Sequence, residues 1–95
     1  MPSHGAVGAA VRSSSRDTLT TVTGAVIESI SEGGPAARAG LQQGDVIIRV
    51  DGRTIRTASD FIAQVRAKPA GTEVEVRFAR EGVESSVMVM LDPLA

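Results

Sequence analysis

Two runs near the C-terminal end of the chain show the clearest hydrophobic pattern. Residues 72–80 alternate polar and apolar side chains with a strict period of two, which predicts a half-buried β-strand. Glu81-Gly82 gives a reversal signal, and residues 83–91 form a second apolar run, so the pair predicts a hairpin. The positions expected to face the core are Val74, Val76, Phe78, Val87, Val89 and Leu91.

The segment 57–68 has helical rather than alternating periodicity. Thr57 or Ser59 can cap its start, and the run Pro69-Ala70-Gly71 ends it. Its apolar stripe consists of Phe61, Ile62 and Val65, with Ala58 and Arg66 beside it. We expect Phe61 to anchor this helix in the core.

The segment 33–55 combines several backbone signals within a short stretch. Pro35 suits the first position of a helix, and Gly40 suits the left-handed residue that ends it, so this helix is short. Residues 46–50 are β-branched and apolar enough for a buried strand, and Asp51-Gly52 predicts a tight turn.

The N-terminal part of the chain is less regular. Residues 6–12 predict a loop leading into a weak strand, 13–23 a polar Ser/Thr-rich loop, and 24–30 another strand. Strands therefore dominate. The whole pattern predicts an α+β, mainly β, fold: a small, partly open barrel or sandwich of five to six strands capped by one long and one short helix.

Composition narrows the function classes. A chain of 95 residues with a formal charge of −1 is one domain without the basic excess that nucleic acid or anionic lipid requires. It has no cysteine, no apolar run of membrane-spanning length and no signal peptide at its start, and we expect it to be a piece of a longer protein. We interpret most of the arginines as solvated surface charges; they are Arg12, Arg16, Arg38, Arg49, Arg53, Arg56, Arg66, Arg77 and Arg80.

The sequence offers little for catalysis. His4 is the only histidine, and nothing holds a triad of Ser13, His4 and Asp17 together. We therefore expect no catalytic residue, no bound metal and no cofactor, which leaves a binding surface. The aspartates expected to serve as turn or cap residues rather than metal ligands are Asp45, Asp51, Asp60 and Asp92.

The segment 33–55 resembles the signature of PDZ domains, in particular those of bacterial proteases, which runs roughly PAxxAGLxxGDVIxxVDGxxI. The resemblance extends over about residues 5–91. The element order, with a strand closing the chain, is similar to the circularly permuted bacterial form found in HtrA-type trypsin-like serine proteases. We accordingly expect residues 1–4 to be a disordered leader, 5–92 the PDZ domain and 93–95 a C-terminal tail.

The resemblance implies a loop that binds a terminal carboxylate through backbone N–H groups. Ala6-Val7-Gly8-Ala9 matches the family pattern x-Φ-Gly-Φ, which makes Val7, Gly8 and Ala9 the candidate carboxylate-binding residues. The chain departs from the family in having alanine at the first and last positions of the loop. A flexible Gly/Ala leader is the alternative interpretation. We expect His4 to be a disordered terminal residue rather than a charge that assists the loop.

The resemblance also implies that a peptide adds as a strand beside Ala10 and Val11 and contacts the long helix. The helix candidates for this groove are Ala58, Ile62, Val65 and Arg66. Core packing is the alternative for Ile62 and Val65: we favour the groove for Ile62 and leave Val65 open. These aliphatic side chains predict a preference for ligands ending in Val, Ala, Leu or Ile.

As a member of this family, the module would capture hydrophobic C-termini and regulate, or supply substrate to, a linked HtrA-type serine protease of the cell envelope, periplasmic or extracellular. Two alternatives stay open: a PDZ domain of another protease, such as a C-terminal processing peptidase or an intramembrane metalloprotease, and a non-proteolytic adaptor or secretion-system module. The apolar end formed by Leu94 and Ala95 also raises the hypothesis of self-association through a neighbouring groove.

Overall fold

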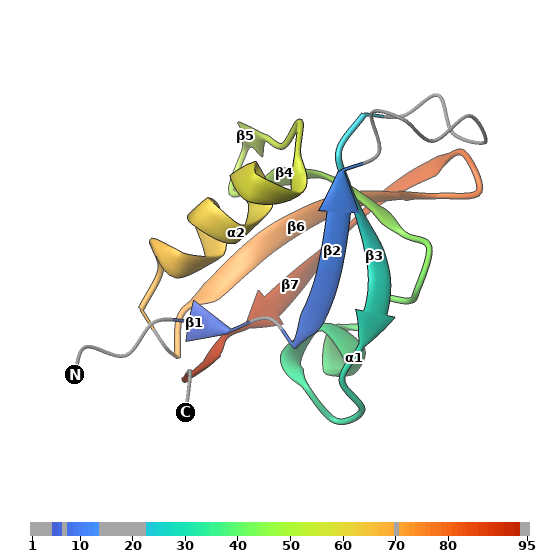
Figure 1. Cartoon of the computed structure of the whole chain (residues 1–95). Helices are drawn as coiled ribbons and strands as arrows, with labels where there is room; N and C mark the ends of the chain where they lie inside the picture. Colours follow the sequence, from blue (N-terminus) through green and yellow to red (C-terminus); the bar gives the residue numbers. More distant parts are fainter. Residues whose placement is uncertain (1–4, 7, 14–22, 70, 94–95) are drawn as a thin grey trace.

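The computed structural model describes residues 5–6, 8–13, 23–69 and 71–93. Their strands pair antiparallel in the order β2-β3-β4-β6-β7, with β5 beside β4, while β1 pairs separately with β8 (Figure 1). This six-stranded sheet with one longer and one shorter helix confirms the predicted fold class. The elements are β1 (Gly5–Ala6), β2 (Ala9–Ser13), β3 (Ala25–Ile30), α1 (Pro35–Ala39), β4 (Val46–Val50), β5 (Arg53–Thr54), α2 (Ala58–Arg66), β6 (Glu73–Arg80), β7 (Val83–Met90) and β8 (Asp92–Pro93).

The hairpin of β6 and β7 follows the predicted alternation. Val74, Val76 and Phe78 are buried, whereas the residues between them are exposed. Arg80 pairs with Val83 across a two-residue turn in which both Glu81 and Gly82 have positive φ, the geometry of a type I′ hairpin. On β7 the core face is less complete, because Val89 is buried but Val87 only half-buried.

The short helix α1 begins and ends where the backbone signals indicate. Pro35 occupies its start, and Gly40 follows its last residue in the left-handed region with φ 94°. The N–H groups of Gly40 and Leu41 donate to the carbonyls of Ala37 and Ala36, so the last turn is closed. Leu41 is buried, which fixes the chain as it turns toward β4.

The buried carboxylate of Asp45 joins the turn after α1 to the β6–β7 hairpin. Asp45 is 2% exposed, and its Oδ2 accepts the Gln42 N–H at 2.9 Å. Arg80 donates to both Asp45 oxygens, at 2.8 and 2.7 Å, and to the Gly40 carbonyl at 2.9 Å. The hydrogen bonds to the Asp45 carboxylate raise the pKa of the Arg80 guanidinium. Arg80 is therefore a structural cation, an exception to the expectation of solvated arginines.

The long helix α2 is shorter than the predicted segment 57–68. Thr57 is its N-cap: the side-chain oxygen accepts the Asp60 N–H at 3.1 Å, and the Asp60 carboxylate accepts the Arg56 N–H at 3.0 Å. Regular helix ends at Arg66, followed by Ala67 as C-cap. Phe61 is buried at 1% exposure, as expected of the core anchor.

Candidate functional site

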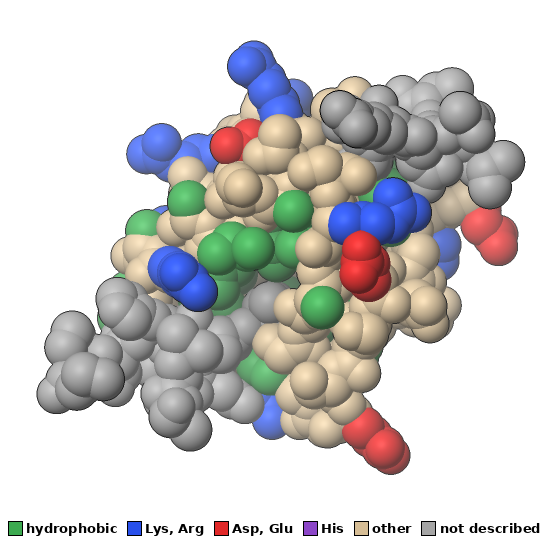
Figure 2. All heavy atoms as spheres, viewed as in Figure 1, with side chains coloured by type: hydrophobic (Ala, Val, Ile, Leu, Met, Phe, Trp, Pro, Cys, Tyr) green, Lys and Arg blue, Asp and Glu red, His purple; other side chains and the backbone are tan. Residues whose placement is uncertain are grey.

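The candidate site lies where β2 and α2 approach each other. β2 is a terminal strand of the sheet: among the described residues it pairs with β3 alone. The helix α2 contacts both β1 and β2. Figure 2 shows hydrophobic side chains gathering in a hollow between α2 and β2. We call the space between these two elements the β2–α2 groove.

Small side chains make up the strand wall of the groove. Ala9 and Val11 are half-buried and pack against the core, whereas Ala10 and Arg12 are exposed. The register with β3 shifts between Ala10 and Val11, which pair with Ser29 and Ile27, so Glu28 is the extra residue of a bulge. The predicted strand residues Ala10 and Val11 therefore lie on the open edge strand.

Gly8 stands immediately before this strand and needs to be glycine. Its φ of 71° lies in the left-handed region, and an added Cβ would lie 3.1 Å from Pro35 Cδ and 3.3 Å from Gly34 Cα. The Gly8 carbonyl accepts the Ser31 N–H at 2.9 Å. The loop is therefore tied to the connection between β3 and α1. Val7, the other residue predicted here, lies outside the described residues.

Of the groove residues predicted on α2, the structure leaves some exposed and buries others. Ile62 is 42% exposed, unusual for a large apolar side chain, while Ala58 is half-buried and Arg66 exposed. Val65 is only 5% exposed and belongs to the core cluster with Phe61. Ile62 is thus the large aliphatic side chain that this helix leaves accessible, and Val65 presents little surface to a ligand.

A hydrogen bond that the sequence did not suggest joins the two walls. Ser13, the last residue of β2, accepts the backbone N–H of Ala58 on its hydroxyl oxygen at 2.9 Å. Ala58 is the first residue of α2, so its N–H has no partner within the helix. This bond fixes the spacing of strand and helix at the end of the groove away from Gly8. No local signal could have indicated it, because the two residues are 45 positions apart.

The described residues contain neither a group of three acidic, histidine or cysteine side chains that could hold a metal ion nor a helix able to cross a membrane. Asp45 accepts the Gln42 N–H in a turn, and Asp60 accepts the Arg56 N–H at the start of α2. Asp51 lies in the turn after β4 and accepts the N–H of Glu75 on β6. The side chain of Asp92 and residues His4, Leu94 and Ala95 lie outside what the structure describes.

Comparison with known proteins identifies the family. A family model described as "PDZ domain" matches residues 5–91. The chain is 38% identical over 71 residues to a Pseudomonas fulva protein named as a probable periplasmic serine endoprotease, DegP-like, covering 75% of this chain and 15% of that protein. It is 40% identical over 76 residues to the serine protease PepD of Mycobacterium tuberculosis, covering 80% of this chain and 15% of PepD.

Solved structures agree with the fold. A serine endoprotease from Yersinia pestis superposes with a TM-score of 0.81 at 25% identity, over 98% of this chain and 30% of that one. The HtrA3 PDZ domain, solved with a phage-derived ligand, superposes with a TM-score of 0.83 at 19% identity, over 97% of this chain and 88% of that one. This chain is thus much shorter than its curated relatives, spanning about 15% of their length. It belongs to the PDZ family, in the form found in bacterial HtrA-type serine proteases.

Proposed function

We propose that this domain captures the free C-terminus of a polypeptide, which adds as a further strand beside β2 within the β2–α2 groove. The observation that carries the proposal is an open edge strand facing a helix that exposes an apolar side chain, Ile62. Main-chain hydrogen bonds to β2 supply affinity without regard to sequence. The HtrA3 PDZ domain, which shares this fold, was solved with the ligand FGRWV, a peptide that ends in valine.

The carboxylate of the ligand binds at the Gly8 end of the groove. A chain in the left-handed conformation at Gly8 can turn successive N–H groups of the loop Val7, Gly8 and Ala9 toward one anion. The last side chain of the ligand then packs among the small residues of β2 and Ile62, with Ala58, Val65 and Arg66 at the margins. Since Ala9, Ala10 and Val11 are small and uncharged, this pocket favours Val, Ala, Leu or Ile.

The longer protein is, on this proposal, an HtrA-type serine protease of the cell envelope, in which peptide capture regulates or feeds the protease. The support is the names of the relatives, several of which are named as probable periplasmic serine endoproteases. A non-proteolytic adaptor is the second candidate. An experiment on the longer protein separates the protease from the adaptor. Peptidase activity is measured on this domain joined to its neighbouring sequence, with and without the ligand peptide.

The direct test of capture compares two peptides that differ only at their end. A fluorescein-labelled peptide ending in Val-COOH should bind at least about tenfold more tightly than the same peptide ending in Val-amide, because amidation removes the charge that the loop binds. A peptide ending in Asp-COOH should also bind weakly, because a charged side chain loses solvation in an apolar pocket. Fluorescence polarisation gives all three affinities. Equal affinity for the acid and the amide would overturn the proposal.

A further inference from the structure

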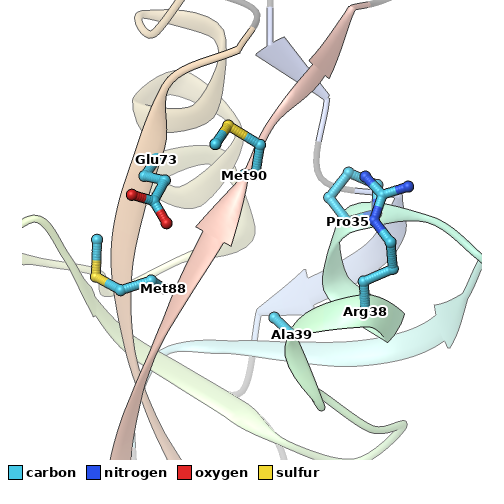
Figure 3. A pocket seen from close by; sticks show the side chains of 6 residues that line it. All are labelled: Pro35, Arg38, Ala39, Glu73, Met88 and Met90. Atoms are coloured by element: carbon cyan, nitrogen blue, oxygen red, sulfur yellow. The ribbon is translucent and has the colours of Figure 1, made fainter.

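A second hollow lies between α1 and the β6–β7 hairpin. Its volume is about 190 Å³. Figure 3 shows α1 on one side, with β7 and β6 across from it. We call this hollow the methionine cleft; its lining residues are Pro35, Arg38, Ala39, Glu73, Met88 and Met90.

The apolar surface of the cleft is unusually accessible. Met88 is 51% and Met90 47% exposed, although both are large apolar side chains. Alternate positions on a strand share a face, so the two methionines lie on the same outer face of the hairpin. Methionine is flexible and polarisable, and adapts its shape to a bound side chain. A cavity of about 150 Å³ is enough for a benzene ring, so the methionine cleft can accept one bulky side chain.

The charges around the cleft indicate what accompanies that side chain. In the β6–β7 register Glu73 lies opposite Met90, and Glu75 opposite Met88. Both carboxylates are exposed, and neither forms an ion pair with a described residue. By contrast, Arg77, the next residue on this face, is paired with Glu84 at 2.9 Å. The strand side of the cleft therefore carries uncompensated negative charge.

Arg38, the cation on the opposite wall, forms no ion pair with Glu73 or Glu75. Arg38 donates from Nη1 to the Gly33 carbonyl at 3.0 Å, and Figure 3 shows its guanidinium turned back beside Pro35. A symmetric contact with a second copy would bring the acidic residues of both molecules together, which is unfavourable. An anionic lipid surface is disfavoured for the same reason.

We propose that the methionine cleft binds a segment of another protein, one that inserts a bulky aliphatic side chain between α1 and the two methionines and places a lysine or arginine beside Glu73. The cleft lies at β7, the terminal strand opposite β2, and its lining residue Pro35 also borders Gly8 at the head of the β2–α2 groove.

The test uses a short peptide with both ends blocked, acetyl-Gly-Lys-Leu-Lys-Gly-amide, which has no free carboxylate for the β2–α2 groove. NMR of the 95-residue chain labelled at its methionine methyl groups should show the Met88 and Met90 signals shifting as peptide is added. The acidic analogue, acetyl-Gly-Glu-Leu-Glu-Gly-amide, should leave both signals in place. Added salt should weaken the binding, because the charged partners are exposed.

Two charge variants locate the contact. Glu73→Gln should raise the dissociation constant about threefold, the size expected for one exposed ion pair. Glu81→Gln removes the same charge at the far hairpin turn and should leave the affinity unchanged. The proposal is overturned if neither methionine signal shifts at about 5 mM basic peptide, a concentration that reveals even millimolar binding. Equal shifts with the acidic peptide, or equal effects of the two variants, also overturn it. The blocked peptide cannot report on carboxylate capture. No outcome of these experiments therefore bears on the proposal for the β2–α2 groove.

Discussion

The segment 33–55 and the β2–α2 groove are built differently. In the segment, two backbone hydrogen bonds close the end of α1, and the Asp45 carboxylate accepts from both the Gln42 N–H and Arg80. In the groove, β2 keeps one edge open and Ile62 stays exposed. The segment that carries the family signature is therefore scaffold, and the surface proposed to bind is made of small, common residues beside it.

The largest effect that separates the two regions is expected from Asp45→Ala. Removing a buried carboxylate with hydrogen bonds to Gln42 and Arg80 should lower the free energy of unfolding by about 2–3 kcal/mol. Urea denaturation measures this loss, and peptide affinity of the folded fraction should stay unchanged. Glu84→Ala is the control: it breaks an exposed ion pair with Arg77 and should cost less than about 1 kcal/mol. Equal losses in the two variants would contradict the assignment of Asp45.

Glycine substitutions give the next largest effect. Gly8 and Gly33 have similar positive φ, 71° and 76°, but an added Cβ meets close neighbours only at Gly8. Both Gly8→Ala and Gly33→Ala should destabilise by about 1–2 kcal/mol through backbone strain. Only Gly8→Ala should also weaken binding of a peptide ending in Val-COOH, since it reshapes the loop at the head of the groove. Similar affinity losses in both variants would mean that strain alone disturbs binding.

Ile62 and Val65 allow a comparison of groove and core within one helix. Ile62→Ser should reduce peptide affinity about tenfold, the loss expected for one or two methylene contacts, with stability changed by less than about 0.5 kcal/mol. Val65→Ala should instead destabilise by about 1.6 kcal/mol, because two methyl groups leave a buried position. Thermal unfolding and fluorescence polarisation measure the two quantities. If Val65→Ala proved the more damaging to affinity, the groove would extend into what we describe as core.

The smallest expected effect is a pH dependence within the scaffold. The Glu75 N–H, donated at 2.8 Å, and secondarily Lys68 hold the pKa of Asp51 below its usual value. Stability from a lowered carboxyl pKa is present above the unfolded value of about 3.9 and is lost as pH falls through the folded pKa. Asp51→Asn, which tolerates the positive φ of this turn, should therefore be less stable than the parent at pH 6.

The stability difference between the parent and Asp51→Asn should shrink as pH falls below about 4, where the unfolded carboxylate protonates, and should vanish as pH falls through the lower pKa of the folded carboxylate. Urea denaturation at each pH measures both proteins, and peptide affinity at pH 6 should be the same for the two. A difference that grew toward low pH would contradict the lowered pKa of Asp51.

The fold could be predicted from sequence because its main elements carry local signals. Strict alternation located β6, the Glu81-Gly82 reversal and the apolar run after it located β7, and Pro35 and Gly40 bounded α1, since these signals act through the backbone of their own segment. Contacts between distant segments could not be read in this way. Arg80 looks like any surface arginine until the hairpin brings it to Asp45, and Ser13 looks like loop until it meets Ala58.

The candidate site was only partly predictable for the same reason. Ile62 and Val65 share one apolar stripe, and periodicity cannot tell which side of it faces the core. The packing of α2 on the rest of the domain decides the matter, burying Val65 and leaving Ile62 exposed. The methionine cleft was also missed, because Met88 and Met90 occupy the positions that an alternating strand assigns to solvent.

Backbone NMR with an unlabelled peptide ending in Val-COOH tests the central claim most directly. At saturation, the amide signals of residues 8–11 and 62–66 should shift, together with that of Val7, because these residues form the proposed binding site. Signals of residues 42–52, in the scaffold segment, should stay in place. Shifts concentrated in 42–52, or no shift in either wall of the β2–α2 groove, would contradict the proposed mode of peptide capture.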